Sequence, residues 1–469
     1  MINMINYNEK LYNIFSKEHQ RLESWMAAVY SKNTDTKLTI KEFRDILYNN
    51  NEEYIVLSFN EIDSNKYIRD RSIWEVYIKL QYLPIPEEDK CHNNENVDKC
   101  NCKNNDSKEK IMYDELTFYV SLVEASSITE NVPNIFSVNT VEEKDYIEAL
   151  ECKYAIHITT TFDNFPLSDY QKQLKLLDSL VPEASIFLDM SCYKAHSGNW
   201  LSYTSTFNLP PSLDYLYTIH AVYDDDKDPN KIEYWFHTHG LYRVGCIELE
   251  IVGVENSNAA YGELLNTCAK MFIERGVPDI GFKFNPAYGV YVCWMPWQDA
   301  LGKLNIYNDI SGGANDRNDG IHNTPSGILV ALDDNNNCHT LDYYNKELTD
   351  NALFYMSTFE TSIMREAAFE KLEYFLKLLE KYRNDKNTSF LVKLGYNETD
   401  NDDEPEHLWF DVHNFTNDGY FDATLINEPY KDLGMHEGDR GMHNIDRLTD
   451  WIIYTEDSTY NSRNIYLLF

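Results

Sequence analysis

Five side chains that can bind a metal ion lie close together in the segment Trp235–Val254, which reads WFHTHGLYRVGCIELEIVGV. Apolar and polar residues alternate on both sides of a turn bounded by two glycines, a pattern typical of a β-hairpin. We expect His237 to face Glu248 across this hairpin and His239 to face Cys246. Because side chains alternate between the two faces of a strand, one face would carry the whole set: His237, His239, Cys246, Glu248 and Glu250.

This set has the chemistry of a zinc site. Zinc binds imidazole, thiolate and carboxylate, and a zinc ion with an open position acidifies water for hydrolysis, with Glu248 or Glu250 as a ligand or general base. The simpler interpretation is a polar outer face whose His–Glu pairs contribute about 0.2–1 kcal/mol each. We favour it, because a register slip of one residue would separate the five side chains. The expected cofactor is therefore none, with zinc as the alternative.

The other face of this hairpin is apolar. It would carry Phe236, Thr238, Ile247, Leu249 and Ile251. A strand pair with one apolar face usually buries that face, so we expect these side chains in the core and the histidine face directed at a cleft or solvent.

A second group of metal-binding residue types lies earlier in the chain. It comprises Cys91, His92, Cys100 and Cys102. The specific zinc pattern is two paired-cysteine motifs at regular spacing, whereas this group has one close cysteine pair inside a polar segment. We therefore expect chance loop cysteines here, with metal binding as the weaker alternative.

Other catalytic motifs are missing from the sequence. There is no Gly-x-Ser-x-Gly motif and no glycine-rich phosphate loop of the Walker or dinucleotide type. The sequence therefore assigns no catalytic residues.

The net charge of the chain is −36 over 469 residues. Such a field repels nucleic acids and anionic membranes and attracts basic proteins, so we expect no nucleic-acid or membrane partner and a basic protein partner if there is one. The sequence has neither an apolar run of about 20 residues nor a signal-peptide pattern. Its nine cysteines are an odd number, which fits reduced thiols and a cytoplasmic location.

Periodicity predicts an α+β fold with mixed or antiparallel sheets and flanking helices. Helical spacing of apolar residues covers 7–30 and Leu348–Arg383, and Thr39 with Glu42 forms a capping-box pattern. Tyr215–Tyr223 is one of several expected strands, and the tail should contain a hairpin around Asn417.

We expect two to three domains along the chain. An N-terminal α+β region would cover residues 1–144, with a disordered insertion at 86–112. A central α+β domain would follow at 145–345, a long helix at 346–384, and a small β-rich domain at 385–469.

Two parts of the chain resemble known bacterial families. The strings QLKLLDSLVPEAS, SGNWLSYTS, LPPSLDYLYTIHAV and HTHGLYRVGCIELEI, within about residues 145–300, are similar to domain-of-unknown-function family 4026. The strings EHLWFDV, INEPYKDLGMHEGD and LTDWIIY, within residues 406–454, resemble family 2314. The position before Gly245, often cysteine in the first family, is Val244 here. The resemblance implies a bacterial protein and brings no activity.

Two functions therefore stay open. The first, which we favour from the sequence, is an acidic cytoplasmic protein-binding module, immunity or antitoxin-like, that captures a basic partner through complementary charge. The second is a metal-dependent hydrolase that uses the His237 and His239 hairpin.

Overall fold

Helices and three mostly antiparallel sheets make up the chain in the computed structural model, which confirms the α+β fold class. The structure describes residues 23–50, 53–62, 72–83, 114–130, 132, 138–163, 165–223, 233–255, 259–306, 310–317, 321–322, 326–349, 354, 358–398 and 405–468. The chain divides into two compact units, Met1–Asp35 with Glu124–Ile363 and Thr36–Val123 with Met364–Phe469. Among the described helices, none is both long and apolar enough to cross a membrane.

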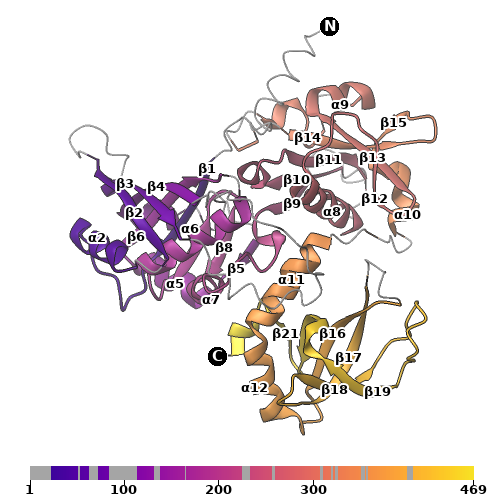
Figure 1. Cartoon of the computed structure of the whole chain (residues 1–469). Helices are drawn as coiled ribbons and strands as arrows, with labels where there is room; N and C mark the ends of the chain where they lie inside the picture. The colour runs from indigo at the N-terminus through magenta and orange to yellow at the C-terminus, as the bar shows by residue number, and fades with distance from the viewer. Residues whose placement is uncertain are drawn as a thin grey trace, which may run out of the picture. The chain divides into compact units, whose positions relative to one another are not determined.

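The first unit begins with five neighbouring strands (Figure 1). In order across the sheet they are β6 (Tyr154–Thr161), β1 (Glu23–Val29), β7 (Ile186–Asp189), β8 (Lys194–Ser197) and β5 (Val138–Thr140). Helices α6 (Pro166–Leu180) and α7 (Gly198–Thr204) pack against these strands. Two shorter helices, α3 (Ser126–Thr129) and α5 (Glu143–Glu151), precede β6 in the chain.

The helix expected over residues 7–30 is wrong at its C-terminal end. Residues 1–22 lie outside the described part of the chain, and Glu23–Val29 forms strand β1. Met26 pairs with Ile158 on one side and with Asp189 on the other. Because β1 is hydrogen-bonded along both edges, tertiary pairing outweighs the helical spacing of its apolar residues.

The second sheet of the first unit holds the predicted hairpin. Its strand order is β12 (Phe284–Ala287), β13 (Val290–Pro296), β14 (Ser326–Leu332), β11 (Glu248–Val254), β10 (Tyr234–His239) and β9 (Thr218–Tyr223), with β15 (Cys338–His339) also paired to β14. Only β11 and β14 run parallel in this sheet. The hairpin β10–β11 therefore lies inside the sheet, between β9 and β14.

Helices cover both faces of this second sheet (Figure 1). Helix α8 (Ala259–Arg275) packs on the apolar hairpin face, where its Tyr261 ring contacts Phe236. Leu249 and Ile251 are fully buried on this face, which confirms the predicted burial. Helix α9 (Trp297–Leu304) packs on the other face, in a core cluster with Trp235 and Val252.

The N-terminal part of the second unit is an antiparallel meander. Strands β2 (Tyr54–Glu61), β3 (Ser72–Tyr82) and β4 (Asp114–Glu124) pair in sequence order, and α2 (Ile40–Asn49) packs against β2. The predicted capping box is present, because the Thr39 side chain accepts from the Glu42 backbone and Glu42 accepts from the Thr39 backbone. Phe43 of α2 stacks on Trp74, with ring centroids 5.3 Å apart.

The C-terminal part of the second unit is a six-stranded antiparallel sheet. Its order is β19 (Arg440–Asn444), β18 (Tyr420–Leu425), β17 (Glu406–Phe415), β16 (Ser389–Tyr396), β20 (Leu448–Tyr454) and β21 (Thr459–Asn461). The β17–β18 pair is the hairpin predicted around Asn417, and Gly419 in its turn has the positive φ that a tight turn requires.

The single helix expected over Leu348–Arg383 is instead three helices. They are α10 (Asn345–Thr349), α11 (Thr358–Glu370) and α12 (Leu372–Tyr382). Between α11 and α12, Lys371 leaves the helical conformation with φ −111° and ψ 10°. Trp451 of the sheet contacts the helices on both sides of this break, because its Nε1 donates to the Ala368 carbonyl of α11 and its ring packs against Phe375 of α12.

Candidate metal centre

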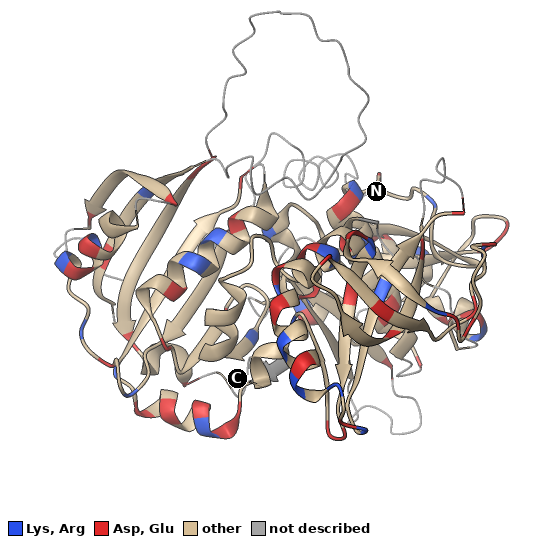
Figure 2. Ribbon diagram, turned by 60° about the horizontal axis from the view of Figure 1, so that its bottom comes forward, with Lys and Arg blue, Asp and Glu red and all other residues tan. Residues whose placement is uncertain are grey.

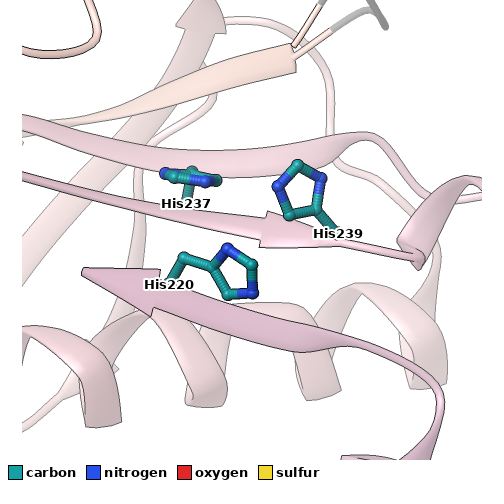
Figure 3. Close-up of side chains that lie close together, drawn as sticks. All are labelled: His220, His237 and His239. Carbon is teal, nitrogen blue, oxygen red and sulfur yellow. The ribbon is translucent and has the colours of Figure 1, made fainter. Parts of the chain in front are cut away.

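Three histidines gather on one face of the second sheet. His220 of β9 lies directly opposite His237 of β10, and His239 follows two residues later on the same face. One ligand atom from each of these histidines lies within 4.8 Å of the other two. Figure 3 shows the three rings on the same side of the two strands.

A fourth histidine reaches this group from a loop before β14. Nε2 of His322 lies 3.3 Å from Nε2 of His237, and its ring centroid is 5.3 Å from that of His239. Two nitrogens bound to one tetrahedral zinc ion, each at about 2.0–2.1 Å, lie about 3.3–3.4 Å apart. The spacing of His237 and His322 fits the hydrogen bond that the two rings make in the absence of an ion, and it equals that of two ligands of one ion. We call these four residues the histidine cluster.

The hairpin histidines are buried, although we expected their face to be directed at a cleft or solvent. His237 is 2% exposed and His239 6% exposed, while His220 is partly buried. Burial lowers the pKa of His220 to about 4, with His322 and Lys194 adding to the effect. Burial, and then the neighbouring imidazoles, hold the pKa of His237 well below its usual 6.5. Neutral imidazole is the form that binds metals, so protons compete weakly for these ligands at neutral pH.

One polar atom of the histidine cluster is left without a partner. Nδ1 of His237 is buried and makes no hydrogen bond to any described residue. Buried polar atoms are almost always paired, and an exception calls for a bound water or ion. Because the His322 side of the ring is reached through Nε2, an ion bound there would leave Nδ1 unsatisfied, and this atom calls for an ordered water of its own.

The observed hairpin register differs from the expected one by two residues. His237 lies opposite Glu250, where we expected Glu248. Because the shift is even, Glu250 stays on the histidine face. Alternation alone therefore predicted which side chains share the polar face. It did not predict which residues lie opposite each other across the hairpin.

Glu250 is held by an arginine rather than offered to a metal. Arg317 of the 3₁₀ helix η4 (Ala314–Arg317) donates to both Glu250 oxygens at 2.6 and 2.7 Å, and Trp235 Nε1 donates to one of them at 2.9 Å. Neither oxygen belongs to the group of neighbouring metal-ligand atoms found among the described residues. Glu250 therefore fixes the η4 loop beside the histidine cluster.

Glu248 closes the turn of the hairpin. Its Oε1 accepts from the backbone N–H groups of Gly240 and Tyr242, and its Oε2 accepts from Thr238 Oγ1 at 2.6 Å. Burial raises the pKa of Glu248 to about 7, against the lowering effect of these hydrogen bonds. The carboxyl group is thus committed to the 3₁₀ helix η3 (Leu241–Val244) that joins the two strands.

The remaining predicted candidates lie apart from the histidine cluster. Cys246 lies just before β11, where its backbone N–H donates to Leu241, and its sulfur is outside the group of neighbouring ligand atoms. The second predicted group, Cys91, His92, Cys100 and Cys102, lies outside the described residues.

Sequence analysis missed His220 and His322. His220 lies in the segment Tyr215–Tyr223, which was expected to be a strand, so pairing that strand with the hairpin could have found it. His322 is 85 positions from His237 and lies outside helices and strands, so no periodic pattern connects it to the sheet.

The comparisons with known proteins give families without an assigned activity. Residues 86–211 and 219–330 match the N- and C-terminal models described as Protein of unknown function (DUF4026). Residues 361–468 match the model described as Uncharacterized protein conserved in bacteria (DUF2314). All four histidines of the cluster lie within the 219–330 match. No curated protein and no solved structure matches the chain. The chain belongs to the DUF4026 family and has a C-terminal DUF2314 region.

Proposed function

We propose that this chain binds one transition-metal ion, with zinc as the best match, through His220, His237 and His239, and that His322 supplies a fourth nitrogen. The observation that carries this proposal is the convergence of the three strand-borne histidines, whose ligand atoms lie within 4.8 Å of one another. Tetrahedral ligands need about 3.3–3.4 Å, so binding would draw the rings slightly together.

The ligand set selects the class of metal. Magnesium and calcium require mostly oxygen ligands, and the carboxyl groups of Glu250 and Glu248 are held by Arg317 and by the η3 turn. Imidazole nitrogen suits zinc, copper, iron and nickel, and four histidines can supply the tetrahedral nitrogen set that zinc takes. If the purified protein contained copper or iron, the proposed site would stand and only the identity of the bound ion would change.

The same geometry favours a closed site over a hydrolytic one. A catalytic zinc site keeps one position open for water, whereas His322, whose Nε2 lies 3.3 Å from that of His237, would fill that position if its loop moved the ring closer to His220 and His239. A hydrolase using Glu248 or Glu250 as base would need a free carboxylate, and both groups are already bound. The proposed ion would instead join β9, β10 and the loop that carries His322.

Protein binding is a second proposal, supported by the net charge of −36 alone. Asp and Glu residues are spread over many of the described helices and turns and alternate with Lys and Arg on several of them (Figure 2). This distribution does not point to a particular docking surface. An immunity or antitoxin-like role in the cytoplasm against a basic partner therefore rests on long-range attraction.

Elemental analysis of protein purified without added metal tests the metal proposal. We expect one equivalent of zinc in the wild type and loss of that equivalent in His220→Ala, His237→Ala and His239→Ala. His436→Ala is the matched control, because its side chain is 80% exposed and lies in the other unit. Wild-type protein without metal, or the same metal content in the cluster variants, would refute the proposal.

A further inference from the structure

We infer that Tyr193 is a positioning residue of the metal centre: its ring fixes the orientation of the His239 ring. The inference rests on the proposed metal site. It starts from backbone strain. Tyr193 lies in the turn between β7 and β8 with a φ of +57°. Asn tolerates this left-handed region, whereas a bulky aromatic residue does not adopt it without a compensating constraint.

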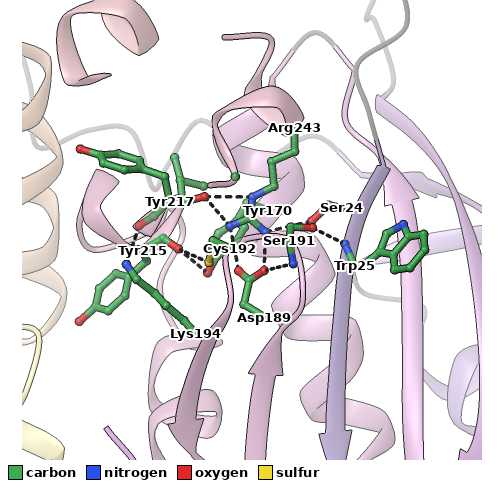
Figure 4. Close-up of polar contacts among 12 residues, drawn as sticks. Ser24, Trp25, Tyr170, Asp189, Ser191, Cys192, Lys194, Tyr215, Tyr217 and Arg243 are labelled. Carbon is green, nitrogen blue, oxygen red and sulfur yellow. Dashed lines mark hydrogen bonds and ion pairs between the residues drawn. The ribbon is translucent and has the colours of Figure 1, made fainter. Parts of the chain in front are cut away.

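Hydrogen bonds of Ser191 and Lys194, two positions before and one after Tyr193, supply that constraint; Figure 4 shows both of these side chains and their contacts. On the N-terminal side, Ser191 accepts from the backbone of Trp25 at 2.8 Å and from the Tyr242 hydroxyl at 3.2 Å. On the C-terminal side, the buried Lys194 ammonium donates to the backbone carbonyls of Asp214 and Tyr217. The turn is thus fixed at residues on either side of the strained position.

Close contact between two turns brings Tyr193 to the histidine cluster. Gly240, directly after His239, has a φ of +111°, and a Cβ added there would lie 2.9 Å from Cys192 Cβ and 2.6 Å from the Leu216 carbonyl oxygen. Only glycine allows this approach. Cys192 directly precedes Tyr193, so the contact places the strained tyrosine beside the last residue of β10.

The result of this arrangement is a ring contact with a proposed metal ligand. The rings of Tyr193 and His239 are 4.9 Å apart at an interplanar angle of 85°, an edge-to-face packing. The other three histidines of the cluster contact the His239 ring as well, at centroid distances of 4.9–5.3 Å. Neighbours of this kind orient metal ligands and set their affinity. The strained backbone conformation therefore places the Tyr193 ring where it fixes the orientation of the His239 ring.

Zinc titration of metal-free protein tests this role, with a chromophoric chelator as competitor. We compare the wild type with Tyr193→Phe, which keeps the ring, and Tyr193→Ala, which removes it. Tyr193→Phe should bind zinc like the wild type, and Tyr193→Ala about 10- to 100-fold more weakly. The absorption bands of bound Co²⁺ should shift in Tyr193→Ala only, a change that a loss of stability alone would not cause.

Two further measurements separate the possible failures. Tyr193→Gly removes both ring and strain, so it should unfold at a higher denaturant concentration than Tyr193→Ala while binding zinc equally weakly. In metal-free protein, the NOE contacts of the His239 ring with the His220 and His237 rings should change in Tyr193→Ala and stay the same in Tyr193→Phe; chemical shifts are not used, because loss of the tyrosine ring current moves them in any orientation. Wild-type affinity and unchanged His239 NOE contacts in folded Tyr193→Ala would overturn this inference. A wild type that binds no zinc would overturn the metal centre, and the NMR comparison would still decide whether Tyr193 orients His239.

Discussion

Two buried polar groups in the first unit differ in how completely their own residues satisfy them. Arg243 is fully buried and donates to both oxygens of Asp189, to Ser24 Oγ and to the Leu216 carbonyl (Figure 4). In the histidine cluster, His237 and His239 are also buried, and His237 keeps an unpaired Nδ1. Burial alone therefore does not separate a structural group from a functional one.

The difference lies in charge and hydrogen bonding. The Asp189–Arg243 pair is neutral as a whole, and the donors of Arg243 are directed at Ser24 of β1, at Asp189 of β7 and at the Leu216 carbonyl before β9. The histidine cluster consists of four similar rings, in which each protonated ring would repel the others. A set of this kind becomes favourable when a cation takes the centre. We infer that the first group builds the fold and the second group requires a ligand.

Breaking the complete pair should have the largest effect. Arg243→Met leaves the Asp189 carboxylate buried without its partner and should cost about 3–5 kcal/mol of unfolding free energy. The control is Arg440→Met, which removes a similar bidentate contact to Asp422 from a largely exposed site and should change the unfolding free energy far less. Urea unfolding measures both. Equal costs for the two variants would show that the buried pair does not stabilise the fold.

Truncating the apolar side of the hairpin should have the next largest effect. Leu249 is fully buried on the face opposite the histidines, and Leu249→Ala should cost about 2–5 kcal/mol. Val222→Ala on the neighbouring strand is the control, because Val222 is 42% exposed and its loss should change the unfolding free energy little. A Leu249→Ala variant as stable as Val222→Ala would contradict the assigned burial.

Acidification should lower the stability of the fold, because the buried histidines resist protonation. The pKa of His220 falls from its usual 6.5 to about 4 on folding, and the pKa of His237 also falls. The unfolded chain then binds more protons than the folded chain, so stability decreases as the pH falls from about 6.5 to 4. Metal-free protein should lose melting temperature from pH 7 to pH 5, and His220→Gln should lose less. An equal loss in both proteins would contradict the assigned shift.

Salt should have the smallest effect, and we expect that effect on the rate at which a basic protein partner binds. If a basic protein is recovered with this chain, its association should slow as salt rises, because the Debye length is already about 8 Å at 0.15 M. Dissociation should change less, since short-range packing controls it. Stopped-flow association measures both rates. An association rate that ignores salt would leave the net charge of −36 without a role in binding.

Local pattern predicted the parts of the site that depend on local sequence. Alternation placed His237, His239 and Glu250 on one face, and Leu249 on the other. Periodicity could not show that Arg317 would hold Glu250, because that contact joins residues 67 positions apart.

The same limit applies to β1, which is a strand because of its two neighbours and in spite of its helical spacing. Register and long-range packing decide which polar groups are satisfied, and the identity of the site depends on that result.

X-ray absorption at the metal edge, on protein purified without added metal, tests the metal centre most directly. We expect bound zinc surrounded by nitrogen at about 2.0–2.1 Å, with the imidazole signature, and loss of this shell in His237→Ala. Protein without bound metal would contradict the account. So would a shell of sulfur at about 2.3 Å, which would assign the ion to cysteines instead.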